Sequence, residues 1–192
     1  MSANLDAKLE VILLKLEKLD AIETSNIKEL ENKNLYLEAY SRRENIKFEN
    51  IQEETGHGAH QEATKDVLRT FLETHLGYEN ARSVEMQRVH RLKVKKSNAS
   101  NDTKPKPIIA RFLRYKDCER IFSLGHRLKG TEFRMYQDLP YGIVERRRKQ
   151  MDTFKLAKRN KIPAAFSKSQ PDKLYIRGKL WPVGKPLDLA LC

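Results

Sequence analysis

The chain has 192 residues, with 38 lysines and arginines against 26 aspartates and glutamates and a formal net charge of +12. Hydrophobic residues make up 39%, which suffices for modest cores and favours one or two small domains plus an extension. No run of about 18 apolar residues occurs and the first residues lack a signal-peptide pattern, so we expect neither a membrane span nor secretion. Cys118 and Cys192 form no disulfide framework, as in reducing compartments. A protein with such an excess of basic residues most often binds a polyanion, usually nucleic acid.

The charge is unevenly distributed along the chain. Residues 1–40 carry a net charge of −3, residues 41–138 carry +6 and residues 139–192 carry +9. The simplest interpretation is two tasks in one chain, with the polyanion-binding surface in the last three quarters.

Residues 1–44 form a predicted coiled-coil oligomerisation helix. Apolar residues follow the alternating four- and three-residue steps of a heptad seam, at Leu5, Leu9, Ile12, Leu16, Leu19, Leu30 and Leu37. Polar residues occupy three seam positions, Glu23, Asn26 and Lys33, and apolar residues beyond the seam at 11–14 favour three or more helices over two. The alternative is one amphipathic helix packed on its own domain. A helix over about 50 Å long exceeds what a small domain can cover, which favours the oligomeric coil.

Residues 45–137 form a predicted α/β domain with the order β-α-β-β-α-β. Strands are expected at 45–51, 83–92, 107–115 and 131–136, helices at 60–76 and 116–128, and a basic loop at 93–107. This order is that of the ferredoxin-like fold of RNA-recognition (RRM) modules. If Ile46, Phe48, Ala110 and Phe112 face the helices, Lys47 and Arg111 lie on the open sheet face, which then lacks stacking aromatics on its central strands.

Residues 138–192 form a predicted small α/β C-terminal domain that binds nucleic acid. A helix is expected at 141–160, followed by strands at 164–166 and 173–176 and a turn at 177–179. The cluster 146–149 spreads about 300° around that helix, so not all four basic residues can lie on a solvated face. Arg147 falls on the apolar stripe and must snorkel, pair or line a cleft. The alternative is a solvated charge run or a nuclear-import signal.

Five motifs in order carry a family resemblance. They are Ser41-Arg42-Arg43-Glu44-Asn45, Arg88-Val89-His90-Arg91-Leu92, Pro107-Ile108-Ile109-Ala110-Arg111-Phe112, Asp138-Leu139-Pro140 and Pro171-Asp172-Lys173-Leu174. With these motifs the chain resembles the ORF1 proteins of LINE-1-type retrotransposons, the transposase-22 family, over nearly its whole length. The resemblance implies a trimeric coiled coil, a non-canonical RNA-recognition domain and a C-terminal domain that together clamp single-stranded nucleic acid. It also implies coating of the element's RNA in a ribonucleoprotein, nucleic-acid chaperone activity and a cytoplasmic and nuclear location.

The resemblance and the basic patches together give the candidate nucleic-acid ligands. Matched family positions are Arg42, Arg43, Arg88, Arg91, Arg111, Arg127, Arg146, Arg147 and Lys173, and the basic patches add Lys47, Arg114, Lys129 and Arg148. The family's tyrosine before Lys173 is missing here, and Tyr175 is its potential substitute.

No catalytic constellation is apparent. The glycine pair at 56 and 58 lacks the Walker spacing, and His57 and His60 have no second ligand pair for a metal. We therefore expect a binding protein that is not an enzyme, without cofactor or metal, whose partners are single-stranded RNA or DNA and further copies of itself, and not a membrane. The rival hypothesis is a coiled-coil interaction protein whose basic modules bind an acidic protein or membrane surface.

Overall fold

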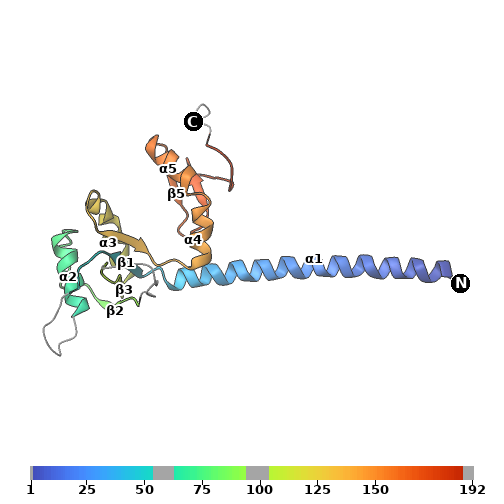
Figure 1. The fold of residues 1–192 in the computed structure, drawn as a ribbon, viewed down its shortest axis with the longest axis horizontal. Coiled ribbons are helices and arrows are strands. Elements are labelled where there is room, and N and C mark those ends of the chain that lie inside the picture. The colour runs from blue at the N-terminus through green and yellow to red at the C-terminus, as the bar shows by residue number, and fades with distance from the viewer. Residues whose placement is uncertain (1, 54–62, 94–103, 188–192) are drawn as a thin grey trace. The chain divides into compact units, whose positions relative to one another are not determined.

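The computed structural model describes residues 2–53, 63–93 and 104–187, with side chains described from Lys8 onward. The protein is α+β, with a long N-terminal helix followed by an antiparallel sheet (Figure 1). It divides into two compact units, Ser41–Leu139 and a second unit that combines Met1–Tyr40 with Pro140–Cys192.

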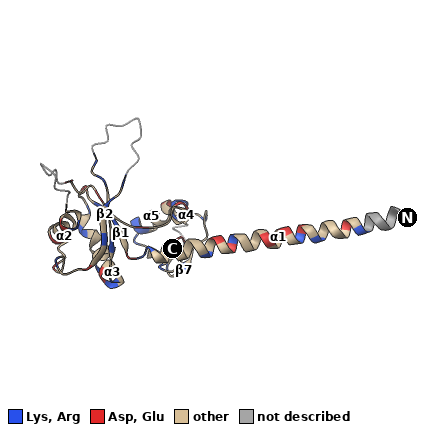
Figure 2. Ribbon diagram, turned by 90° about the horizontal axis from the view of Figure 1, so that it is seen from below, with Lys and Arg blue, Asp and Glu red and all other residues tan. Residues whose placement is uncertain are grey.

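Helix α1 (Ser2–Ser41) is one continuous helix of 40 residues, about 60 Å at the usual rise per residue. Glycine and proline are absent before Gly56, and Glu29 and Lys33 form an i,i+4 ion pair of 2.7 Å. Basic and acidic residues are interspersed along it (Figure 2). Its seam side chains are about half exposed, as at Leu9 (51%), Ile12 (54%) and Leu16 (51%), whereas the side chain of Leu5 lies outside the described residues. No helix in the described part of the chain is long and apolar enough to cross a bilayer.

The Ser41–Leu139 unit has the predicted element order. It contains β1 (Asn45–Glu49), α2 (Thr64–Thr74), β2 (Met86–Arg91), β3 (Ile108–Phe112), α3 (Tyr115–Ser123), the 3-10 helix η1 (Leu124–Leu128) and β4 (Arg134–Gln137). The strands pair antiparallel in the spatial order β2-β3-β1-β4, which makes β1 and β3 central.

The core of this unit forms where the sheet meets α2 and α3. Ile46 and Phe48 of β1 and Ala110 and Phe112 of β3 are fully buried, as their period-two alternation predicts. Phe71 of α2 meets Phe48 edge to face at 5.9 Å between ring centroids. On β2 the register shifts between Met86 and Arg88, which is typical of a β-bulge.

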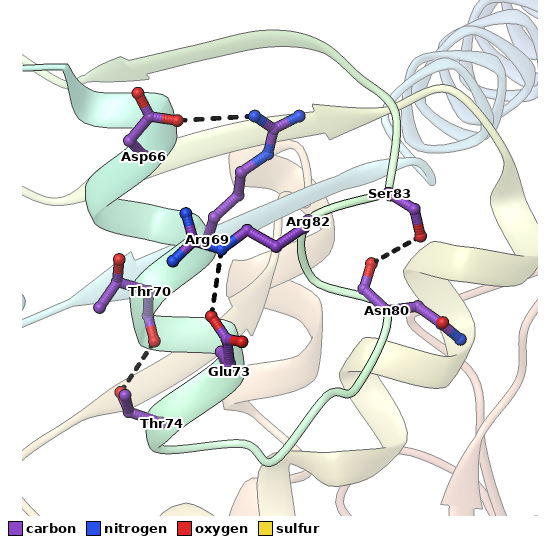
Figure 3. Close-up of polar contacts among 8 residues, drawn as sticks. All are labelled: Asp66, Arg69, Thr70, Glu73, Thr74, Asn80, Arg82 and Ser83. Carbon is purple, nitrogen blue, oxygen red and sulfur yellow. Dashed lines mark hydrogen bonds and ion pairs between the residues drawn. The ribbon is translucent and has the colours of Figure 1, made fainter.

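One ion pair attaches the segment after α2 to that helix, and further polar contacts lie within the segment and within the helix (Figure 3). The Arg82 guanidinium donates to the Glu73 carboxylate at 3.2 Å, and the Ser83 hydroxyl donates to the Asn80 carbonyl at 3.2 Å. Arg69 pairs with Asp66 on the helix itself at 3.5 Å. The exposed Arg82–Glu73 pair orients the approach to β2 and contributes little stability.

The C-terminal segment contains α4 (Tyr141–Arg148), α5 (Met151–Arg159), β5 (Ala164–Phe166), β6 (Leu174–Ile176) and β7 (Lys179–Leu180). Its three strands form an antiparallel sheet in chain order over a core of Ala157, Ile162, Ala164, Leu174, Ile176 and Leu187. Arg177 (φ 53°) and Gly178 (φ 75°) make the predicted turn between β6 and β7, where the left-handed conformation favours glycine.

The prediction of one helix over 141–160 is wrong, because the helix breaks between α4 and α5. Gln150 is only 4% exposed, and its side-chain amide donates to the Asp172 carbonyl at 2.7 Å. Its backbone N–H bonds to the carbonyl three residues back, at Arg147, at 2.9 Å. A distant backbone contact therefore holds Gln150 at the break, where the following helix starts again.

Candidate nucleic-acid interface

The face of the four-stranded sheet opposite its core carries the first group of candidate ligands. In one transverse row, Lys47 of β1 pairs with Ile109 of β3 on one side and with Tyr136 of β4 on the other. His90 of β2 extends this row beyond Ile109. These side chains point away from the core because their neighbours Phe48, Ala110 and Met135 pack into it.

A second row on the same face brings two arginines together. Arg111 of β3 is directly opposite Arg88 of β2 on one side and Asn45 of β1 on the other. Like charges directly opposite one another destabilise a strand pair. The Arg111 guanidinium is compensated by Glu44 at 3.3 Å, whereas Arg88 is exposed and has no hydrogen-bond or ion-pair partner among the described residues. The face therefore has an uncompensated positive charge at Arg88.

Asp138 organises the cations at the end of β1. Its carboxylate lies 2.6 Å from the Lys47 ammonium and 3.6 Å from the Arg42 guanidinium, and it accepts the Asn45 amide at 3.0 Å. Burial raises the pKa of this carboxyl, but the hydrogen bonds from Asn45 and Lys47 and the charges of Lys47 and Arg42 outweigh it and hold the pKa below its usual range. Asp138 therefore stays ionised and fixes Arg42 and Lys47 in place.

Glu44, which directly precedes Asn45 at the same end of β1, serves a similar purpose on the side of β3. It pairs with Arg43 at 3.1 Å as well as with Arg111, and the Arg43 guanidinium also lies 5.6 Å from the centroid of the Tyr115 ring. The nearby Cys118 thiol bonds to the Arg43 carbonyl at 3.4 Å. Burial, with lesser contributions from Glu44 and Glu119, raises the pKa of Cys118 to about 12, so its thiol is not a nucleophile.

Two of the predicted ligands in the Ser41–Leu139 unit have their guanidinium groups bound to backbone carbonyls. Arg91 donates to the carbonyls of Ile51 (2.8 Å), Gln52 (2.7 Å) and Lys106 (2.8 Å). Arg127 donates to the carbonyl of Leu76 at 2.6 Å, just beyond the end of α2. These contacts hold loops and a helix end together.

The remaining two candidates of this unit lie apart from the two rows. Arg114 is exposed at the residue that precedes α3, and Lys129 is exposed just after η1. The sheet rows therefore gather Lys47, Arg88 and Arg111, with Arg42 and Arg43 attached through Asp138 and Glu44.

In the second unit, the buried Asp172 holds Arg146. The two side chains lie 3.2 Å apart, and Asp172 is 3% exposed. Tyr36 of α1 also hydrogen-bonds to this carboxylate, and burial followed by the Asp172 hydrogen bond raises the pKa of its phenol. Asp172 therefore links the end of α1 to α4 within this unit.

Arg147 pairs with the protein, which is one of the outcomes the sequence allowed. Its guanidinium donates to the Pro171 carbonyl and stacks 4.6 Å from the centroid of the Phe166 ring. Burial lowers the pKa of Arg147 to about 10, so the group remains protonated at neutral pH. Contacts within the protein therefore engage most of the Arg147 side chain.

Arg148 and Lys173 lie more openly on the same unit. The Arg148 side chain is 80% exposed and lies 3.8 Å from Glu145 one helical turn away. Lys173 directly precedes β6 and is two residues from Tyr175, and both are half-buried, so the strand alternation places them on the same side of the small sheet.

Sequence reasoning missed the aromatic residue and the organising acids of these surfaces. Tyr136 is 47% exposed on the edge strand, and the alternation Phe133, Met135 against Arg134, Tyr136 is the signal that could have placed it outward. The motifs that contain Asp138 and Asp172 give no sign that each carboxylate is buried against an arginine.

No protein-family model matches this chain, and no curated protein matches it. Among the described residues, no three His, Cys, Asp or Glu side chains gather as a metal site, and His57 and His60 lie outside those residues.

The pH dependence of the free energy of unfolding tests the role of Asp138. Because its folded pKa is depressed below the ordinary value of 3.8, its stabilisation is present above about pH 4 and is lost as the pH falls through the folded pKa. Asp138→Asn should lower the free energy of unfolding by about 1–3 kcal/mol at neutral pH, and this difference should shrink in acid. Chemical denaturation at several pH values measures it. The control Glu73→Gln removes an exposed ion pair and should differ little from wild type, so a pH-independent loss at Asp138 would contradict the assignment.

Arg147 and its neighbour form a matched pair for stability. Arg147→Ala removes the donor to Pro171 and the stacking on Phe166, so it should cost about 1–3 kcal/mol in thermal or denaturant unfolding. Arg148→Ala removes an exposed side chain and should stay within about 0.5 kcal/mol of wild type. Equal losses would show that Arg147 does not pack as described.

Proposed function

We propose that the protein binds single-stranded RNA and single-stranded DNA through the open sheet face of the Ser41–Leu139 unit. We propose further that it acts by binding and not by catalysis. The observation that carries the proposal is the cross-strand pair of Arg88 and Arg111. Glu44 compensates Arg111, whereas Arg88 opposite it has no counter-charge among the described residues, and a phosphate beside the two arginines would supply one. A polyanion is therefore the natural ligand of this face.

The fold supports the same function. The order β-α-β-β-α-β is that of the ferredoxin-like fold, and we propose that this unit is an RNA-recognition-like domain. Its central strands present Lys47, Ile109 and Arg111 in place of stacking rings. Phosphate contacts carry little sequence information, so we expect weak sequence preference, with Tyr136 at the edge as a sequence-tolerant stacking residue.

The apolar seam of α1 supports an assembly of several copies. Four seam side chains are each at least half exposed, namely Leu9, Ile12, Leu16 and Leu19. An isolated helix gains no stability from an apolar stripe that stays in water. We propose that this helix forms a homotrimeric coiled coil. Each copy would then add its own basic surfaces, including Arg146, Arg148 and Lys173 of the second unit, and later contacts on a long strand become intramolecular.

Taken together, we propose that the chain is an ORF1-type protein of a LINE-1-like element. It would coat the element's RNA as a ribonucleoprotein in the cytoplasm, with access to the nucleus. Contacts made mainly with phosphates exchange easily, which would let bound strands anneal and rearrange as nucleic-acid chaperone activity requires.

Salt dependence tests the proposed binding. If six phosphates are engaged, affinity for single-stranded RNA should fall roughly 300-fold between 50 and 200 mM salt. Arg88→Gln should reduce the slope of log affinity against log salt by about 0.7 and should leave stability unchanged or slightly higher. Fluorescence anisotropy measures both slopes. Lys116→Gln removes one exposed charge on α3 and should keep the wild-type slope. A flat salt response in the wild type would contradict the proposal and favour an acidic protein or a membrane surface as partner.

A second matched pair tests the assembly. Leu16 lies on the predicted seam and Leu14 lies outside it, yet both are half exposed in the single chain (51% and 55%). Leu16→Asp should dissociate the oligomer in sedimentation equilibrium, because a charge at the seam cannot be buried there. Leu14→Asp should leave the oligomer intact. Equal behaviour of the two variants would exclude this seam.

A further inference from the structure

An apolar cleft lies between η1 and β4 in the Ser41–Leu139 unit. Its volume is about 440 Å³, within the usual range for sites that bind small molecules. It is lined by Phe122, Gly125, His126, Leu128, Lys129, Gly130, Phe133, Arg134 and Met135.

The walls and rim of this cleft differ in chemistry. Phe122, Phe133 and Met135 provide an apolar wall, Lys129 and Arg134 are basic, and the lining contains no aspartate or glutamate. The Phe133 ring packs edge to face on Phe71 at 5.1 Å, so the protein fixes its orientation. The cleft is thus suited to a flat apolar group that carries a negative charge.

The rim is held in position before any ligand arrives. The Arg134 guanidinium donates through Nη1 alone to the carbonyls of Thr131 and Phe133, which fixes it over the turn into β4, and its other nitrogen atoms make no hydrogen bond within the described residues. Gly125 keeps the cleft open, because a Cβ atom there would lie 2.9 Å from the Met135 methyl group. Any side chain at 125 would push Met135 or occupy the space itself.

Strand β4 connects the cleft to the open face. It is an edge strand of the sheet, with Tyr136 on the open face and Met135 on the opposite side, in the cleft. A strand of nucleic acid that crosses the row Lys47–Tyr136 reaches this edge next. The cleft is therefore placed to take a group from the same strand as it leaves the sheet.

We infer that the cleft receives one nucleobase of the bound single strand, with the adjoining phosphate contacted by Lys129 and Arg134. The inference rests on the proposed function and adds to it a base-binding subsite at the edge of the sheet. An apolar wall accepts any base by its face, so the subsite discriminates a strand with bases from a bare phosphodiester chain, and not one sequence from another.

Two probes of the same length separate base binding from phosphate binding. One is an oligothymidylate and the other a strand of abasic nucleotides with the same number of phosphates. The intact protein should bind the first more tightly, and Gly125→Leu should reduce the ratio of the two affinities by about fivefold or more, as expected for loss of one stacked base. Lys129→Gln should also weaken oligothymidylate binding, whereas Lys116→Gln should do so less.

Each outcome has a distinct meaning. If Gly125→Leu unfolds the unit, a strand containing 5-iodouridine should be photo-crosslinked to the wild type, and the labelled residue located by fragment-ion mass spectrometry should be Phe122 or Phe133 of the cleft. An unchanged affinity ratio in a folded Gly125→Leu, or labelling confined to the open sheet face, would overturn the subsite while leaving the proposed function intact. Failure of the wild type to bind either probe would overturn the proposed function itself.

Discussion

The period-two alternation of the two central strands is the constraint on which the rest of the Ser41–Leu139 unit depends. Ile46 and Phe48 of β1 are fully buried, and so are Ala110 and Phe112 of β3. A slip of one residue would expose all four, so their burial fixes the pairing register. The same register then places Lys47 beside Tyr136, and Arg111 opposite Arg88. The hydrophobic core therefore determines where the positive charges stand, and the basic face follows from packing that does not itself involve charge.

Buried carboxylates determine which cations are fixed and which are available. Asp138 fixes Arg42 and Lys47, and in the second unit Asp172 fixes Arg146. A buried carboxylate must be paired with a cation. Each pair therefore orients its basic side chain and neutralises part of the positive charge of that side chain. The exposed Arg88 has no such partner among the described residues. An external phosphate therefore gains the most binding free energy from a charge-assisted hydrogen bond at this position.

The sequence predicts the local elements well and the long-range contacts poorly. The alternation in β1 and β3 and the turn at Arg177 and Gly178 are local patterns, and the structure confirms them. The break at Gln150 was missed because its amide bonds to the carbonyl of Asp172, 22 residues away. For the same reason the sequence did not indicate that Arg91 and Arg127 bind distant carbonyls. Residue type alone marks a basic ligand candidate, but only the fold shows whether its donors are already used.

The central claim joins assembly through α1 to phosphate binding on the sheet, and length-dependent binding tests the two together. The affinity of the intact protein for single-stranded RNA should be measured at fixed salt with strands of about 12 nucleotides, near the size of one site, and with strands several times longer. Tethered copies should bind the longer strand at least about 100-fold more tightly, because later contacts are intramolecular. Equal affinities for short and long strands would contradict the account.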